Sequence, residues 1–428
     1  MRLIATMMIA VLIIIVCAGC LRSGIIVDEQ DVLMLDDEAI RTITVWHTYS
    51  DEETRVFEED IIPSFEREYP AIRIESIRQG SNVEYQSAII ARASAGKTPD
   101  VIRMDYSWVP RFASYGLLEP LENLPDYDQV AAEQRGHMLH TNQYNGRVYG
   151  LPLNMNTKAA IYNRKLLHEA GLGESPDSLL AIIEAAREHR YVIGMIGLEL
   201  WSSLPYFHGL GGVLADEGFT RTSGYFNSDS SVNAVQTMLD LYNEGIINPG
   251  MLDGTSDLWN DLYKDTNMLM IDEGPWYYSI LLNTTALNVD LLEATLPAPF
   301  PANGQYGSII GGESLVITKG TRYREEAWTF IRFMLQRDTQ RMIYDQTGLF
   351  PTNMEAFQGD QISLIGDRYM APYVAGIDDA FYRPPLPQWN KIERLYFEAL
   401  KAIFVDGRDV RDALDEAAAS MDALLAQE

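Results

Sequence analysis

The sequence has little cysteine and comparatively few basic residues. Its 428 residues include 2 cysteines, Cys17 and Cys20, and both stand near the N-terminus. The rest of the chain therefore offers no pair for an internal disulfide. Lysine and arginine number 33 against 61 aspartate and glutamate residues, which gives a formal net charge of -28. A surface this acidic repels nucleic acid and anionic lipid headgroups, so we expect no nucleic-acid partner and interpret the acidic excess as a source of solubility.

Motifs for metals and phosphate-bearing cofactors are also missing. The 6 histidines form no HExxH motif and no cysteine-supported zinc pattern. The Gly209-Leu210-Gly211-Gly212 segment lacks the lysine and the serine or threonine of a P-loop, and we interpret it as a turn. We therefore expect neither a metal site nor a cofactor.

Long hydrophobic runs are confined to the N-terminus. Residues 3–16 form an apolar run that is shorter than the roughly 20 residues needed to span a bilayer. Cys17-Ala18-Gly19-Cys20 follows directly. This layout predicts a secretory signal peptide at residues 1–19, lipidation of Cys20, and a tether at residues 20–38 that holds an extracytoplasmic protein to the cell membrane. The alternative is an uncleaved signal anchor or cleavage at another position.

Strand and helix patterns alternate in two series along the chain. The first series comprises residues 43–47, 51–68, 72–77, 81–95 and 100–104. We expect Pro63 to break the first of its helices. The second series has strands at 159–162, 191–200 and 267–271 and helices at 164–170, 176–190 and 231–243. Because one hydrophobic core stops growing near roughly 250–300 residues, these patterns predict an α/β protein with two lobes.

Several short motifs stand in a fixed order along the chain. They are Gly96-Lys97-Thr98-Pro99-Asp100-Val101, Tyr115-Gly116-Leu117-Leu118, Tyr144-Asn145-Gly146, Gly274-Pro275-Trp276 and Gly311-Gly312-Glu313. In order and spacing, from about residue 43 to the C-terminus, they resemble the bacterial extracellular solute-binding family that includes maltose-type sugar receptors. Each motif is short, and the set as a whole carries the resemblance.

The resemblance implies a periplasmic-binding-protein-like fold, in which crossing segments join two α/β lobes around a ligand cleft. Lobe 1 would comprise residues 39–153 and 309–350, and lobe 2 residues 154–308 and 351–428. It also implies that the protein is no enzyme and, as a monomer, captures a carbohydrate by lobe closure and delivers it to the permease subunits of an ABC importer. The alternatives are a glycan-active hydrolase, a receptor for a polyol phosphate or peptide, and a receptor feeding a chemosensor.

Aromatic and polar side chains at strand ends are candidates for ligand binding, because ligands of open α/β sheets lie outside the carboxyl ends of the strands. Trp46, His47 and Tyr49 follow the first strand, and Asp105 and Trp108 follow the third. A role for Asp105 as the cap of the next helix is the alternative.

The resemblance adds further candidates, of which Trp276 is the central one, because Gly274 and Pro275 present it directly after a strand. At Asn156, ordinary hinge hydrogen bonding is the alternative. Gln79, Arg383 and Trp389 are left outside the predicted set. The residues that the resemblance implies are Asn156, Glu199, Trp201, Trp276, Gly312 and Glu313.

Overall fold

Among the described residues, six strands from distant parts of the chain form one mixed sheet. The computed structural model describes residues 40–80, 83–264, 267–283, 289–302, 306–357 and 367–427. Strand β1 pairs in parallel with β2 and β3, whereas β11 runs antiparallel to both β3 and β6. In spatial order the strands are β12 (Phe350–Pro351), β6 (Gly150–Thr157), β11 (Ile310–Ile317), β3 (Val101–Asp105), β1 (Arg41–His47) and β2 (Ile72–Arg78).

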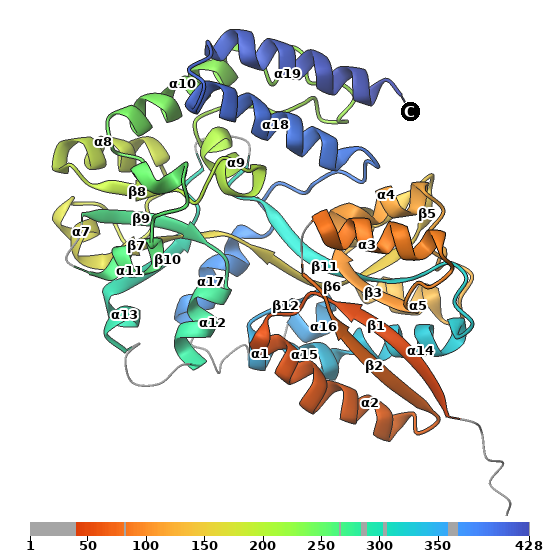
Figure 1. Cartoon of the computed structure of the whole chain (residues 1–428). Helices are drawn as coiled ribbons and strands as arrows, with labels where there is room; N and C mark the ends of the chain where they lie inside the picture. Colours follow the sequence, from red (N-terminus) through yellow and green to blue (C-terminus); the bar gives the residue numbers. More distant parts are fainter. Residues whose placement is uncertain are drawn as a thin grey trace, which may run out of the picture. The chain divides into compact units, whose positions relative to one another are not determined.

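Both faces of this first sheet are covered by helices. Ile43 and Val45 of β1 belong to the core on the side of α1, α2, α14 and α15, whereas Trp46 belongs to the core on the side of α3 and α4 (Figure 1). Successive residues of a strand point to opposite faces, so a strand covered on both sides is apolar at every position. The strands predicted at residues 43–47, 72–77 and 100–104 are confirmed.

The helices that accompany the first sheet follow the predicted order, with one correction. No break occurs at Pro63, because the helix runs on from α1 through a π-helical turn at Phe57–Ile61, which directly precedes the proline in the first turn of α2. The bounds are α1 (Asp51–Val56), η1 (Phe57–Ile61), α2 (Ile62–Glu68), α3 (Val83–Ser94), η2 (Tyr106–Trp108), α4 (Val109–Ser114), α5 (Tyr127–Ala132), α6 (Gly136–His140), α14 (Arg324–Met334), α15 (Arg337–Thr347) and α16 (Met354–Phe357). A short hairpin pairs β4 (Gln143–Tyr144) with β5 (Arg147–Val148).

A second sheet contains four strands of the described chain. Strand β7 pairs antiparallel with β10 and β9, and β9 pairs in parallel with β8. Only Lys158 separates β6 of the first sheet from β7 of the second, so one extended segment passes between the sheets. The spatial order is β10 (Thr295–Pro299), β7 (Ala159–Asn163), β9 (Met268–Glu273) and β8 (Val192–Gly194).

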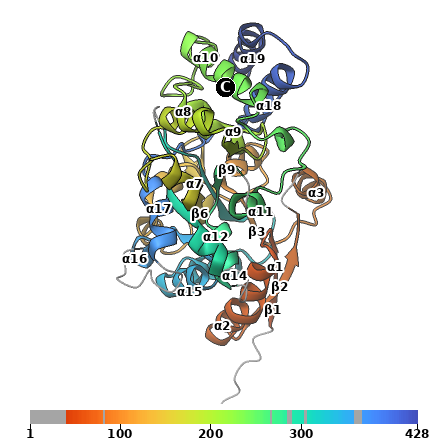
Figure 2. The ribbon, with the colours of Figure 1, turned by 90° about the vertical axis from the view of Figure 1, so that its left-hand side faces the viewer.

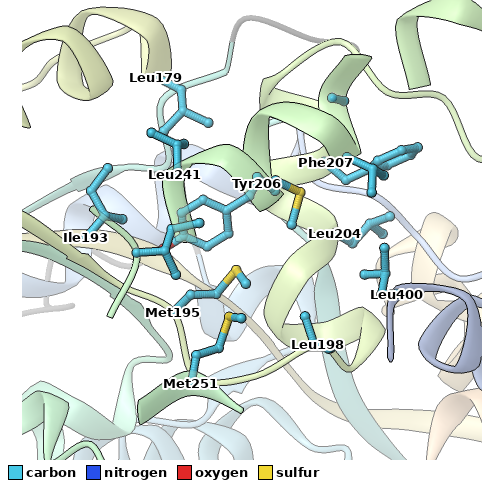
Figure 3. Close-up of a cluster of buried hydrophobic side chains, with 14 of the residues drawn as sticks. Leu179, Ile193, Met195, Leu198, Leu204, Tyr206, Phe207, Leu241, Met251 and Leu400 are labelled. Carbon is cyan, nitrogen blue, oxygen red and sulfur yellow. The ribbon is translucent and has the colours of Figure 1, made fainter. Parts of the chain in front are cut away.

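Helices cover the second sheet as well. In Figure 2, α10, α18 and α19 lie together beside α8 and α9, and these helices share a core with the sheet. Figure 3 shows part of that core, including Ile193 from β8, Tyr206 from α9 and Leu400 from α18. The bounds are α7 (Arg164–Glu169), α8 (Leu179–His189), α9 (Leu200–Gly209), α10 (Asp229–Asn243), η3 (Pro249–Met251), α11 (Leu258–Tyr263), α12 (Trp276–Asn283), α13 (Val289–Ala294), α17 (Asp367–Gly376), α18 (Trp389–Phe404) and α19 (Val410–Leu425).

Two predictions for this half of the chain are wrong in their limits. Helix α8 begins after Ser178, whose hydroxyl accepts from the N–H of Ala181, and not at Pro176. The strand predicted at residues 191–200 shortens to β8, because α9 begins at Leu200. Within the described ranges, no helix is both long and apolar enough to cross a membrane.

Candidate functional site

A cavity of about 690 Å³ lies between segments of the two sheets. The first half of the chain contributes the loops after β1 and β2, including Thr48, Tyr49 and Gln79, and α12 of the second half contributes Trp276. Ser50 holds the loop after β1, because it caps α1 in a reciprocal capping box with Glu53. The cavity thus lies at the carboxyl ends of two parallel strands, where ligands of open α/β sheets bind.

Trp276 does not stand alone at this cavity. Its ring stacks near that of Trp201, with ring centroids 6.3 Å apart and planes inclined by 30°. Lys158 donates to the carbonyl oxygen of Trp201 at 3.2 Å and forms a fully buried ion pair with Asp272. Gly311 faces Trp201 closely, since a Cβ atom there would lie 3.0 Å from the indole. The crossing segments and the two tryptophans are therefore packed against one another.

The carboxylate of Glu273 fixes the orientation of Trp276. Its Oε1 accepts from the Trp276 indole Nε1 at 2.8 Å and from the Gly274 N–H at 2.9 Å. Its Oε2 accepts from Nε1 of Trp259 at 2.9 Å. Burial raises the pKa of Glu273, and the bonds from Trp259 and Gly274 oppose that shift. Glu273 was not among the predicted residues, although an acidic residue directly before Gly274-Pro275-Trp276 is visible in the sequence.

A buried polar cluster around Arg103 contacts the ring of Tyr49. The guanidinium of Arg103 lies over the Tyr49 ring, 4.1 Å from its centroid, and pairs with Glu313 at 2.8 Å. Asn154 donates to the same carboxylate at 2.7 Å. Arg103 also donates to the Thr48 hydroxyl at 2.9 Å, so two residues of the cavity wall depend on it. Glu313 is thus bound by Arg103 and Asn154, and Arg103 was not among the predicted residues.

His47 is fully buried behind this wall. Its Nδ1 accepts from the N–H of Tyr49 at 3.3 Å, and its Nε2 lies 2.9 Å from the hydroxyl of Ser76. Since Ser76 donates to Glu58, the imidazole carries its proton on Nε2. Burial, together with the positive charges of Arg103 and Arg78, lowers the pKa of His47 to about 4. The residue positions Tyr49 as a neutral ring.

Asp105 has two partners at the end of β3, Ser107 and Arg383. Its Oδ1 accepts from the N–H of Ser107 at 2.8 Å. Asp105 therefore caps η2, which is the alternative role that the sequence suggested for it. Its Oδ2 pairs with Arg383 at 3.0 Å. Arg383 also stacks over Tyr106, 4.5 Å from its ring centroid, and Trp389 donates to Glu393 behind it. Arg383 therefore belongs to a buried polar cluster that includes Asp105, one of the predicted ligand-binding residues.

The other predicted residues are placed apart from the cavity wall. Trp46 is 2% exposed and packs against Tyr85, which in turn packs against Trp108. Trp46 is a core residue here, because α3 and α4 cover the face of the sheet on which it lies. Glu199 is exposed at the start of α9 and is not among the residues that line the cavity.

Asn156 and Gly312, two of the predicted ligand-binding residues, lie on the neighbouring strands β6 and β11. Asn156 of β6 is opposite Gly311 of β11, and Gly312 is opposite Met155. Gly312 approaches the backbone of β6 so closely that a Cβ atom would lie 2.3 Å from the carbonyl oxygen of Asn154. Cys20 and the residues 1–38 assigned to signal peptide and tether lie outside the described residues.

Comparison with known proteins identifies the class of this fold and site. Residues 60–365 match the family of bacterial extracellular solute-binding proteins. The match covers more than half of the chain, so this protein belongs to that family. The family predicted from the spaced motifs is therefore confirmed.

Individual relatives are distant in sequence and close in fold. A binding protein of Brucella abortus (strain 2308) is 25% identical over 378 residues, which cover 86% of this chain and 89% of that protein. The maltooligosaccharide ABC transporter solute-binding lipoprotein of Streptococcus pneumoniae (strain ATCC BAA-255 / R6) is 22% identical and spans 74% of this chain and 73% of its own. The solute-binding protein of an ABC transporter from Thermotoga lettingae, bound with α-D-tagatose, superposes with a TM-score of 0.77 at 22% identity, covering 90% of this chain and 100% of that one. The predicted two-lobe α/β fold is thereby confirmed.

Proposed function

We propose that this protein captures a saccharide in the cavity between its two lobes and presents it to the permease subunits of an ABC importer. The observation that carries the proposal is the Trp276 ring, held by Glu273 and flanked by Trp201, at a cavity whose lining includes hydroxyl, carboxylate and amide side chains. A sugar ring offers C–H faces that stack on an aromatic plate and hydroxyls that need polar partners. The named sugar-binding relatives support the same ligand class.

The remaining parts of the proposal concern anchorage and motion. We place lobe 1 at residues 39–153 and 309–350, and lobe 2 at residues 154–308 and 351–428. The lobes close over the ligand by bending at the crossing segments, which is the motion of periplasmic binding proteins as a class. The protein acts as a monomer outside the cytoplasm, where a lipid on Cys20 holds it to the membrane. The Streptococcus pneumoniae relative is itself described as a lipoprotein.

Binding without hydrolysis is the chemistry that we propose. A glycan hydrolase needs a free general acid and a second free carboxylate flanking one bond. The acidic candidates are Asp105, Glu199 and Glu313. Asp105 and Glu313 each pair with a buried arginine. Glu199 is exposed and does not line the cavity. Chromatography of the sugar after prolonged incubation tests this point, and we expect it to be recovered unchanged.

Calorimetric titration of the purified protein with tagatose, maltose, maltotriose and diacetylchitobiose tests the proposed ligand class. We expect saturable binding of at least one sugar, and a melting temperature that rises with its concentration. Trp276→Ala should weaken that binding by more than about 30-fold, the effect of a residue at the centre of a binding site.

Tyr242→Ala is the matched control. Tyr242 is a partly buried aromatic residue of α10 that does not line the cavity, so its removal should leave affinity unchanged. A wild-type protein that binds none of the sugars would refute the ligand class. Equal affinities of the wild-type and Trp276→Ala proteins would refute the site.

A further inference from the structure

A second cavity of about 270 Å³ is lined by Glu273 and by residues between Met195 and Trp259, and Trp276 is not among its lining residues. Ile196 comes from the loop after β8, Ser256 and Asp257 precede α11, and Trp259 lies within α11. Glu273, at the end of β9, lines the same cavity. None of the candidates from the sequence belongs to it.

Glu273 is the polar group that gives this cavity a specific chemistry. It is 7% exposed, and its carboxylate has two oxygens with about two acceptor positions each. The Gly274 N–H and the Trp276 indole occupy both positions on Oε1. The described hydrogen bonds to Oε2 come from Trp259 alone, which leaves one acceptor position on a buried carboxylate. A hydroxyl is the kind of group that fills such a position.

Trp259 gives the cavity a fixed aromatic wall. Its N–H is bound to Glu273, and its ring meets that of Tyr277 edge to face, with centroids 5.0 Å apart at 77°. The indole is partly exposed and held in one orientation before any ligand arrives. Preorganised aromatic rings bind at a low cost in conformational entropy. Asp257, which is exposed at the rim, adds a further acceptor.

We propose that this second cavity is a carbohydrate subsite for an additional sugar unit of a chain whose neighbouring unit stacks on Trp276. The proposal rests on the proposed saccharide-binding function and extends it to ligand length. One carboxylate binds the indole N–H groups of both walls, so Glu273 sets the orientation of the two aromatic plates together. Longer saccharides should therefore bind more tightly than short ones, by about tenfold for the unit that reaches Trp259.

Two exposed isoleucines, one at each cavity, allow a matched test. Ile196 lines the second cavity and is 42% exposed, whereas Ile280 lines the first and is 48% exposed. A tryptophan at either position should occupy part of the cavity that the replaced isoleucine lines. Affinities are measured by calorimetry for the di-, tri- and tetrasaccharides of the maltose and chitobiose series. We expect Ile196→Trp to abolish the roughly tenfold gain with length and to leave disaccharide affinity within about twofold, and Ile280→Trp to weaken every length.

A second variant protects the test against a local folding defect. Trp259→Phe keeps an aromatic ring against Tyr277 and removes the N–H that Glu273 binds, so it should also reduce the gain with length. The subsite is overturned if the wild-type protein shows no dependence on length, or if Ile196→Trp and Trp259→Phe bind every length as the wild type does. A wild-type protein that binds no member of either series overturns the proposed function itself, and the subsite with it.

Discussion

The guanidinium of Arg383 lies 3.0 Å from the carboxylate of Asp105, although 278 positions separate the two residues. The pair joins the end of β3 to the segment that leads into α18. The Arg383 side chain is 9% exposed, and its other nitrogens are bound to Tyr106 and Ser107. A charge this well enclosed depends on its partners, because burial without them is costly.

We therefore expect Arg383→Met to lower the free energy of unfolding by roughly 3 kcal/mol, since it leaves Asp105 beside an apolar group. Asp105→Asn should cost less, and the double variant should be more stable than the sum of the single effects predicts. Urea denaturation of the four proteins measures this coupling.

The Arg187–Glu244 pair serves as the control for that cycle. Its two side chains are 45% and 44% exposed, and such surface pairs contribute about 0–1 kcal/mol. Arg187→Met should therefore be nearly neutral. Similar losses from Arg187→Met and Arg383→Met would contradict the importance that we give to burial.

The buried imidazole of His47 makes stability depend on pH. Its pKa is about 4 in the folded protein and near 6.5 in the unfolded chain, so between these values the unfolded state binds more protons. The free energy of unfolding must then fall as the pH is lowered from about 6.5 to 4, by roughly 2–3 kcal/mol from this residue.

His47→Gln should flatten that part of the profile, because an amide keeps hydrogen-bonding groups and does not titrate. Unfolding is measured in urea from pH 4 to pH 8 for both proteins, and the difference between the two curves isolates His47. His208, whose pKa burial likewise lowers to about 4, supplies a residual slope in both. If the two curves of unfolding free energy against pH ran parallel, the pKa of His47 would be the same in the folded and unfolded states.

Substitution of Gly312 tests how closely β11 approaches β6. Its φ is +142°, and a Cβ atom would meet the Asn154 carbonyl oxygen at 2.3 Å. Gly312→Ala should lower the free energy of unfolding by at least about 2 kcal/mol, because backbone and not a flexible side chain is in the way. Gly136→Ala, at a glycine with nothing within 4 Å, should change it by less than about 1 kcal/mol. Equal effects in urea denaturation would argue against the strained contact.

The first lobe could be predicted well because local patterns and tertiary burial agree there. The alternation of strand-like and helix-like segments between residues 43 and 104 predicted an α/β arrangement, and β1, β2 and β3 lie within one or two residues of the predicted limits. The position of Trp46 could not be read from the same pattern. Whether its face of the sheet is open or covered depends on α3 and α4, whose packing is a tertiary property.

A site residue could be predicted only where the residues adjacent to it in the sequence determine how its side chain is placed. Trp276 follows a strand and the Gly274-Pro275 pair, and it lines the cavity. Arg103 and Arg383 gave no such signal, because each is recognised by a partner more than 200 positions away. A charged residue inside a strand shows that a partner exists, and the fold alone tells which one.

The place of β11 in the middle of the first sheet affects how the chain is made. Thr157 at the end of β6 and Ile309 just before β11 are 152 positions apart. At roughly 5–20 residues per second, a ribosome needs about 8–30 s to translate that stretch, and during this time β3 and β6 lack the strand that separates them. Open edges of apolar strands recruit other chains. The first sheet can therefore be completed only after residue 317 has been synthesised.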